Sequence, residues 1–161
     1  MCLINPQWVE AISVSAAAIF AAVTFFHQLE QEKVNLWKTL DSEFNYQLRS
    51  ERARLAFAFL KNEPGIADCY TPIMVFFEKL GYLVVKRRID TELAYDTFFD
   101  AFSAYLTVTR RYLQEENNED SEVYRNVFRL EHEWGLARWI GSKEKITCFF
   151  TEENAIDPSS S

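Results

Sequence analysis

The chain has 161 residues, of which 24 are acidic and 17 are basic, so its formal net charge is −7. This excess of carboxylates repels phosphate backbones and argues against a nucleic-acid-binding protein. The three cysteines, Cys2, Cys69 and Cys148, are far apart and include no C-x-x-C pair, which argues against a disulfide framework or a zinc site. They are consistent with a reducing compartment.

An apolar stretch runs from Trp8 to Phe26, and Glu10 is its only charged residue. A helix over these 19 residues would be about 28 Å long, close to the thickness of the hydrocarbon core of a bilayer. The eight Val, Ile and Phe residues together favour membrane insertion by about 2.5–5 kcal/mol, and Glu10 is near enough to the end to reach the interface. We therefore predict a short tail over residues 1–7, a transmembrane helix over residues 8–29, and contact with the lipid bilayer through residues 8–26.

Two other interpretations of this stretch are weaker. A helix buried in a soluble core normally keeps a polar face, and this one has almost none. A cleaved signal peptide would need Lys or Arg before the apolar residues, and residues 1–7 contain neither. Lys33 and Lys38 follow the stretch instead, so the positive-inside rule places the C-terminal part of the chain in the cytoplasm.

Small side chains recur every fourth residue within the stretch, at Ser13, Ala17 and Ala21 and again at Ala18 and Ala22. This spacing lets two helices approach closely in a membrane. It predicts self-association, so the expected partners are a second copy of the chain or another protein.

Residues 30–150 are predicted to form a helical cytosolic domain. The chain has only four glycines and four prolines, and no alternating β pattern is sustained, so we expect an all-α fold. About four antiparallel helices should form a small bundle. The first of them runs from about Asp41 to Asn62. Its predicted apolar stripe consists of Phe44, Leu48, Leu55, Ala56 and Phe59.

The next predicted helix has the clearest signals. Thr71 is a good N-cap, and Pro72 suits the first helical position. Its apolar residues recur at helical spacing and are Ile73, Phe76, Phe77, Leu80, Leu83 and Val84. Gly81 costs about 1 kcal/mol relative to alanine inside a helix, so we predict that a neighbouring helix approaches closely at this point.

Asp90 is predicted to cap a long helix that ends near Glu116, and Ser121 to cap a further helix that ends at Gly141. The predicted core positions on these two helices are Leu93, Phe98, Phe102, Tyr105, Leu106, Tyr112, Val123, Val127, Phe128, Leu130, Trp134 and Ile140. Residues 151–161 are predicted to be a disordered tail. The candidates for contact anchors outside the core are Trp37 and Trp139.

Several short runs resemble a known family. They are Phe76-Phe77-Glu78-Lys79-Leu80-Gly81-Tyr82-Leu83-Val84, Ile89-Asp90, the aromatic residues Tyr95, Phe98 and Phe99, and Tyr124-Arg125-Asn126-Val127-Phe128. Together with the single N-terminal span, these runs resemble a family of uncharacterised bacterial proteins described only as a domain of unknown function, over about residues 8–140. The resemblance implies a single-pass protein of the cell inner membrane with a helical cytoplasmic domain, and it transfers no catalytic residue.

Few residues suggest catalysis or metal binding. His27 lies where the predicted span meets water. His132 lies between Glu131 and Glu133, but consecutive helical side chains point about 100° apart and cannot converge on one metal ion. Position 136 is Leu, so the H-E-x-x-H zinc pattern is absent, as are the nucleophile-elbow, P-loop and dinucleotide-binding motifs. We predict no catalytic, cofactor-binding or metal-binding residues, and His132 with acids from another helix is the one metal hypothesis left open.

Two charged features have competing interpretations. Glu78 lies beside an apolar stripe, and Arg49, Arg52 or Arg54 could form an ion pair with it. We favour a half-exposed ion pair on the helix surface. The alternative is a buried ion pair. The three arginines themselves lie on a side of their helix that suits contact with water. The basic run at residues 86–88 closes a helix, where cations offset the helix dipole, and contact with anionic headgroups is the alternative.

These observations predict a membrane-anchored helical protein that acts as a non-enzymatic interaction or scaffolding module through its cytosolic bundle. The alternative is an oligomerising membrane effector of the pore-forming, stress-response or phage-defence type. Such an effector would need a polar stripe along its span, and Ser13, Ser15 and Thr24 do not form a continuous one. An enzyme is the least favoured class, because it would need a pocket that gathers acids around His132.

Overall fold

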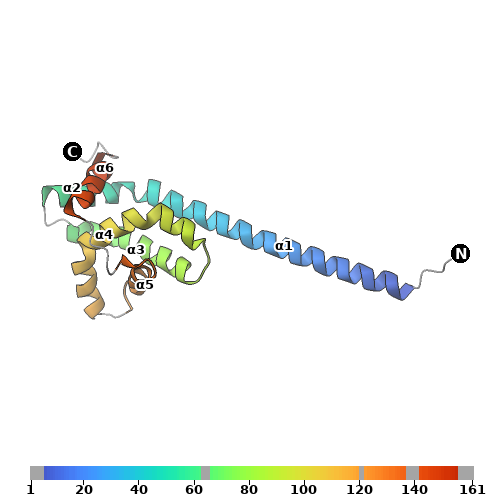
Figure 1. Ribbon diagram of the computed structural model, residues 1–161. Helices are drawn as coiled ribbons and strands as arrows, with labels where there is room; N and C mark the ends of the chain where they lie inside the picture. The colour runs from blue at the N-terminus through green and yellow to red at the C-terminus, as the bar shows by residue number, and fades with distance from the viewer. Residues whose placement is uncertain (1–5, 63–65, 120–121, 137–141, 156–161) are drawn as a thin grey trace.

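The computed structural model describes residues 6–62, 66–119, 122–136 and 142–155, with side chains described at all of these except 6–13, 67–68 and 117–119. Within these ranges every regular element is helical, which confirms the all-α prediction. The elements are α1 (Pro6–Ser42), the π-helical segment η1 (Glu43–Gln47), α2 (Arg49–Lys61), α3 (Ile66–Val85), α4 (Thr91–Glu119), α5 (Arg125–Glu133) and α6 (Lys143–Ala155). Figure 1 shows α2 to α6 gathered in a bundle from which the long α1 projects.

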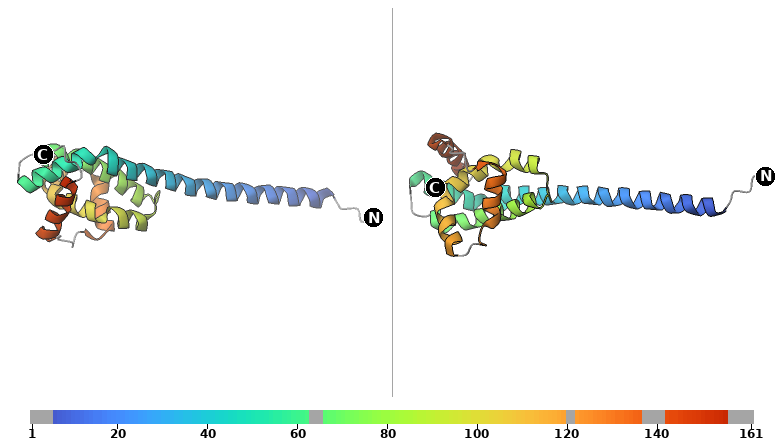
Figure 2. Two further views of the ribbon diagram at one scale, coloured as in Figure 1. Left: turned by 90° about the horizontal axis from the view of Figure 1, so that it is seen from above. Right: turned by 60° about the horizontal axis from the view of Figure 1, so that its bottom comes forward.

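α1 has two parts with different surroundings. Its N-terminal part extends away from the bundle in every view (Figures 1 and 2), and the side chains at residues 14–28 are exposed. From Leu29 onward, apolar side chains at helical spacing reach the bundle, and Leu40 is almost fully buried. Trp37 packs on Phe98 of α4, with ring centroids 5.5 Å apart. From residue 14 on, the apolar stretch is therefore not folded back into a core made by this chain.

The transmembrane part of the sequence prediction is not supported by the described residues. Among them, no helix has an apolar stretch of the length needed to cross a membrane. The predicted span begins with residues 8–13, which lie outside the residues whose side chains are described. The structure therefore describes the side chains of the apolar stretch only from Val14 onward.

The predicted helix over residues 41–62 is interrupted by η1. The backbone N–H of Leu48 donates to the carbonyl five residues earlier, at 3.0 Å, which is the π-helical pattern. The guanidinium of Arg52 donates to the carbonyl of Phe44 at 2.8 Å, so a contact made by α2 stabilises this irregular turn. α2 ends where Asn62 adopts a left-handed φ of 53°.

α3 begins earlier than predicted. It starts at Ile66, so Pro72 lies inside the helix and Thr71 is not its N-cap. A proline inside a helix removes one backbone hydrogen bond. The turn before it carries Cys69 and Tyr70, whose side chains are buried in the bundle, and their burial offsets the lost bond.

The apolar stripe of α3 lies at the centre of the core, as predicted. All of its members are buried, and they are Ile73, Phe76, Phe77, Leu80, Leu83 and Val84. Phe44 of η1 and Phe98 of α4 pack on Phe76, with ring centroids 5.1 and 5.5 Å away. Offset and edge contacts between rings add to the stabilisation that burial provides. The core therefore joins α1, η1 and α4 around α3.

Gly81 lies where α5 packs against α3, which confirms the predicted close approach. A Cβ atom at this position would come within 2.8 Å of the carbonyl carbon of Asn126. Real side chains do not tolerate this separation from a backbone atom, so α5 can approach only a glycine here.

The two later predicted helices are confirmed in position and corrected at their ends. The Oδ1 atom of Asp90 accepts a hydrogen bond from the N–H of Leu93 at 3.0 Å, so Asp90 caps α4 as predicted. α5 begins after Tyr124, whose φ of 54° is left-handed, and ends at Glu133. The predicted N-cap at Ser121 and the predicted end at Gly141 lie outside the described residues.

Most of the predicted core positions on these helices are confirmed. The buried ones are Phe98, Phe102, Tyr105, Leu106, Val127, Leu130 and Trp134. Tyr112, Val123 and Phe128 are partly buried against the core. Leu93 is 45% exposed, because it lies in the first turn of α4 at the end of the bundle. Ile140 lies outside the described residues.

α6 corrects the predicted disordered tail over residues 151–161. The helix continues through Ala155, because Ile146, Phe150 and Glu153 are buried in the bundle. Phe150 packs on Phe59 of α2, with ring centroids 4.8 Å apart. The described bundle therefore has one helix more than the four predicted, and residues 156–161 lie outside the described residues.

Candidate functional site

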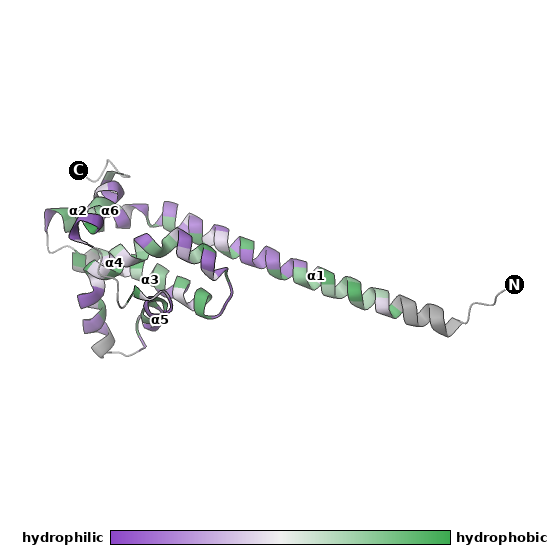
Figure 3. Ribbon diagram, in the orientation of Figure 1, coloured by the Kyte–Doolittle hydropathy of each residue, from purple (hydrophilic) through white to green (hydrophobic). Residues whose placement is uncertain are grey.

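The projecting part of α1 has an exposed apolar surface, which we call the apolar rod and define as residues 14–28. Its large apolar side chains are 58–74% exposed and are Val14, Ile19, Phe20, Val23, Phe25 and Phe26. Consecutive helical residues point about 100° apart, so the exposure of both Phe25 and Phe26 places apolar surface on more than one side. Figure 3 shows the apolar colouring along the projecting helix, followed by polar colouring where α1 meets the bundle.

Two polar side chains of the apolar rod make contacts within the helix. The Oγ1 atom of Thr24 donates to the carbonyl of Phe20 at 2.9 Å, a local bond that needs no water. His27 is exposed at the end of the rod, and its Nε2 atom lies 3.1 Å from the side-chain amide nitrogen of Gln31. The predicted boundary role of His27 therefore fits its position between apolar and polar parts of α1.

The small residues of the rod are also exposed. Ala17, Ala18, Ala21 and Ala22 all lie on its surface, whereas Ser13 lies outside the residues whose side chains are described. Self-association through these residues stays a prediction. Their exposure leaves the surface open to a second helix.

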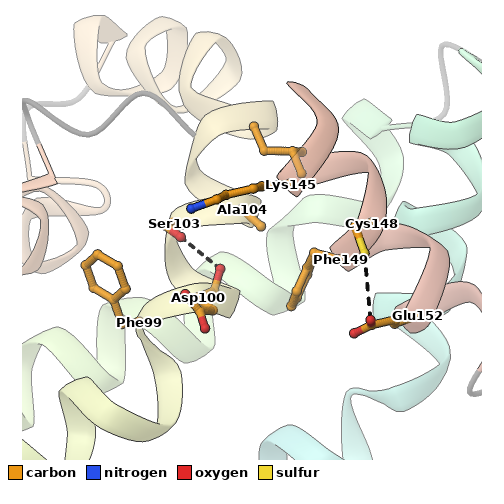
Figure 4. Close-up of a pocket in the computed structure, with 9 residues that line it drawn as sticks. Phe99, Asp100, Ser103, Ala104, Lys145, Cys148, Phe149 and Glu152 are labelled. Atoms are coloured by element: carbon orange, nitrogen blue, oxygen red, sulfur yellow. Dashed lines mark hydrogen bonds between the residues drawn. The ribbon is translucent and has the colours of Figure 1, made fainter. Parts of the chain in front are cut away.

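A groove of about 510 Å³ lies between α4 and α6 (Figure 4). It is lined by Phe99, Asp100, Ser103 and Ala104 of α4 and by Lys145, Ile146, Cys148, Phe149 and Glu152 of α6. The thiol of Cys148 lies 3.8 Å from a carboxylate oxygen of Glu152, and the hydroxyl of Ser103 donates to the carbonyl of Asp100 at 2.9 Å. The lining therefore offers apolar contacts from Phe99 and Phe149 and charged contacts from Asp100, Lys145 and Glu152.

Among the residues whose side chains are described, the most deeply buried charges belong to Arg52 and Glu153, which form a bidentate ion pair between α2 and α6. Nε and Nη2 of Arg52 donate to the two carboxylate oxygens at 2.6 and 2.5 Å. The hydroxyl of Tyr105 on α4 donates to the same carboxylate at 2.7 Å. The guanidinium also lies over the ring of Phe44, 4.0 Å from its centroid. This network therefore joins four elements, α2, α4, α6 and η1.

Burial and the neighbouring carboxylate both act on the phenol of this network. They raise the pKa of Tyr105 well above its ordinary value of 10.0. The pKa of Arg52 is lowered by burial, but the hydrogen bonds and charge of Glu153 outweigh this effect and raise it overall. Arg52 is therefore a buried, permanently charged residue, and its predicted solvation is wrong.

Glu78 has a different partner from the one predicted. Its carboxylate accepts hydrogen bonds from the backbone N–H groups of Asn126 and Val127 at 2.8 and 2.9 Å and from the side-chain amide of Asn126 at 2.6 Å. Arg52 pairs with Glu153, and Arg54 pairs with Glu51 in its own helix. The predicted pairings of Glu78 with Arg52 and with Arg54 are therefore wrong.

The remaining metal hypothesis receives no support from the described residues. His132 is exposed, and its neighbour Glu131 is buried and paired with Arg110 of α4. Within the described ranges, no group of three or more His, Cys, Asp and Glu side chains is placed to hold a metal ion. The described residues therefore do not gather around His132 the acidic side chains that a metal site would need.

The two tryptophan candidates have separate outcomes. Trp37 is partly buried against Phe98, so it contributes to the contact between α1 and the bundle rather than to a free surface. Trp139 lies outside the described residues.

Comparison of the chain with family models, curated proteins and solved structures found no match. The resemblance to an uncharacterised bacterial family therefore stays a prediction.

Proposed function

We propose that this chain is a membrane-anchored helical protein whose bundle acts as a non-enzymatic interaction or scaffolding module. The observation that carries the proposal is the exposure of the apolar rod to its surroundings at residues 14–28. A helix with apolar surface on more than one side is stable where an apolar medium surrounds it, and a bilayer provides this medium.

The exposed apolar surface of the rod is consistent with this role. Full transfer of one large apolar side chain from water contributes about 1.5–3 kcal/mol. The six exposed side chains of the rod retain roughly two-thirds of their surface, so the set contributes about 6–12 kcal/mol. The rod itself is about 22 Å long, so apolar residues before Val14 would have to complete a span of about 30 Å.

The bundle supports an interaction role for two reasons. Its groove between α4 and α6 presents the aromatic Phe99 and Phe149 and the charged Lys145 and Glu152 to a partner. The net charge of −7 disfavours nucleic acid as that partner. The proposed partners are the lipid bilayer for the rod and a protein or a second copy for the rest, at the cytoplasmic face of the inner membrane.

An oligomerising membrane effector is the second candidate, and the exposed Ala17 and Ala21 favour it. The two candidates differ in their effect on cells. Induced expression of the effector should collapse the membrane potential and stop growth, whereas an interaction module should leave both unchanged.

Membrane extraction tests the anchor. The full chain should stay in the membrane pellet after an alkaline carbonate wash. Replacing Ile19 and Val23 by arginine adds about 3 kcal/mol of insertion cost at each position and should release the protein into the supernatant. Arginine at Asn35 and Thr39, two exposed positions on the polar part of α1, is the matched control and should not release it. Wild-type protein found wholly in the supernatant would refute the proposal.

A further inference from the structure

The turn between α3 and α4 contains three consecutive exposed cations, Lys86, Arg87 and Arg88, which we call the basic turn. It lies at the end of the bundle from which α1 projects, and all three views agree on this position (Figures 1 and 2). The guanidinium of Arg88 lies 3.7 Å from the carboxylate of Glu32 on α1. The basic turn is therefore held beside the base of the apolar rod.

A groove of about 340 Å³ connects the basic turn with the apolar rod. Its lining includes Arg87 and Arg88 of the turn and Phe26 and Leu29 of α1. Phe26 is one of the last large apolar residues of the rod. If the rod lies in hydrocarbon, the adjacent basic turn lies at the depth of the lipid headgroups.

The backbone of the basic turn ends α3 in a left-handed conformation of the kind that usually carries glycine. The N–H of Arg88 donates to the carbonyl of Leu83 and the N–H of Arg87 to that of Val84, both at 2.9 Å, which is the Schellman pattern. Arg87 has a left-handed φ of 53°, a conformation in which glycine is normally favoured. An arginine therefore occupies a position where backbone preference alone would select glycine.

Apolar side chains accompany the cations. Tyr82, Val85 and Leu93 flank the turn and are 50%, 37% and 45% exposed. Cations interleaved with exposed tyrosine and aliphatic side chains are typical of surfaces that contact the interface of a bilayer. This composition distinguishes the turn from a solvated helix end.

The described acidic groups near the turn form an ion pair with only one of its three cations, Arg88. Glu30 pairs with Lys33 at 2.8 Å, and Glu32 faces Arg88. Asp90 caps α4 through the N–H of Leu93. Among the described residues, no carboxylate forms an ion pair with Lys86 or Arg87. These two cations remain available on a chain whose net charge is otherwise negative.

We infer that the basic turn binds the anionic phospholipid headgroups of the bilayer that holds the apolar rod. The inference rests on the proposed membrane anchor and adds the partner chemistry and the contact that orients the bundle. A cation close to an anionic membrane surface strengthens binding by about fivefold. The acidic remainder of the surface is repelled by the same lipids, so the bundle is oriented with the basic turn toward them.

Hydrogen–deuterium exchange of the full chain in lipid nanodiscs tests the inference. Discs of phosphatidylcholine alone are compared with discs that also contain phosphatidylglycerol. Exchange at residues 82–93 should slow severalfold when phosphatidylglycerol is present, and concentrated salt should reverse the slowing. Equal exchange in both discs, with the rod inserted, would overturn the headgroup contact and leave the anchor intact. Failure of the rod to insert in either disc would overturn both.

Two sets of variants separate lipid contact from folding. Arg87→Gly removes a cation and relieves the left-handed strain, so it should slow exchange in phosphatidylcholine discs but weaken the response to phosphatidylglycerol. Replacing Lys86 and Arg88 by glutamine as well should abolish that response. The control replaces Arg111 and Arg125 by glutamine, which removes exposed charge elsewhere and should keep the response. The same slowing by inorganic phosphate in detergent would show an anion site rather than a bilayer contact and would overturn the inference.

Discussion

The carboxylate of Glu78 on α3 caps the N-terminus of α5 by accepting hydrogen bonds from the backbone and the side chain of Asn126. Tyr124, which precedes α5 in a left-handed conformation, makes no side-chain cap hydrogen bond to it. The first N–H groups of a helix lack partners within it, and a negative charge also suits that end of the helix dipole. A residue 48 positions earlier in the chain therefore supplies the cap.

Replacing Glu78 by alanine should lower the free energy of unfolding by about 1–3 kcal/mol, because it leaves half-buried N–H groups without their acceptor. Glu78→Gln keeps one acceptor oxygen and should lose less. Urea denaturation of the full chain in mild detergent measures both. Equal stability of the alanine variant and the wild type would show that water replaces the cap.

Gly81→Ala should destabilise the protein by about 1–3 kcal/mol, since the added Cβ would overlap the backbone of Asn126. The sign is the informative result, because the same change in an exposed helix normally stabilises by up to about 1 kcal/mol. The measurement is the shift of the urea midpoint. A stabilised variant would mean that α5 does not approach α3 as closely as described.

Breaking the buried ion pair should release α6 from the bundle. Arg52→Met or Glu153→Leu alone leaves an uncompensated buried charge and should cost about 3–5 kcal/mol, whereas the double variant should recover most of this loss. Hydrogen exchange in α6 reports its detachment directly. Additive losses in the double variant would show that the two side chains do not interact.

Stability should fall at alkaline pH because of Tyr105. Its pKa is raised above the ordinary value of 10.0 by burial and by Glu153, so the fold favours the neutral phenol. This contribution is complete below about pH 10 and is lost as the pH rises toward the raised pKa. Tyr105→Phe should be less stable at neutral pH by about 1.5–3 kcal/mol, through loss of a hydrogen bond to a carboxylate, and should lose less stability above pH 10. Urea titrations across this pH range test both parts, and identical pH profiles would contradict the second.

Features that depend on local pattern were predictable. The stripe from Ile73 to Val84 is buried because helical periodicity places these residues on one face. Asp90 caps α4 because its side chain reaches an N–H three residues away. Gly81 indicated close packing, because glycine inside a helix is unfavourable without such a reason.

The ends of helices and the partners of charges were less predictable. η1 depends on Arg52, which binds the freed carbonyl of Phe44 from the next helix. The early start of α3 depends on burial of Tyr70, which the local preference of Pro72 for a first turn does not include. The groove between α4 and α6 was not predicted, because α6 itself was assigned in part to a tail.

The amino-acid sequence by itself determined the helical class, the core face of α3 and the apolar character of the rod, because each arises from residues within a few turns of one another. Only the tertiary structure decided that Arg52 meets Glu153, that Glu78 caps α5 and that the basic turn lies beside the rod. These contacts join residues far apart in the chain. Their energies depend on distance and burial in the folded bundle, which no local pattern specifies.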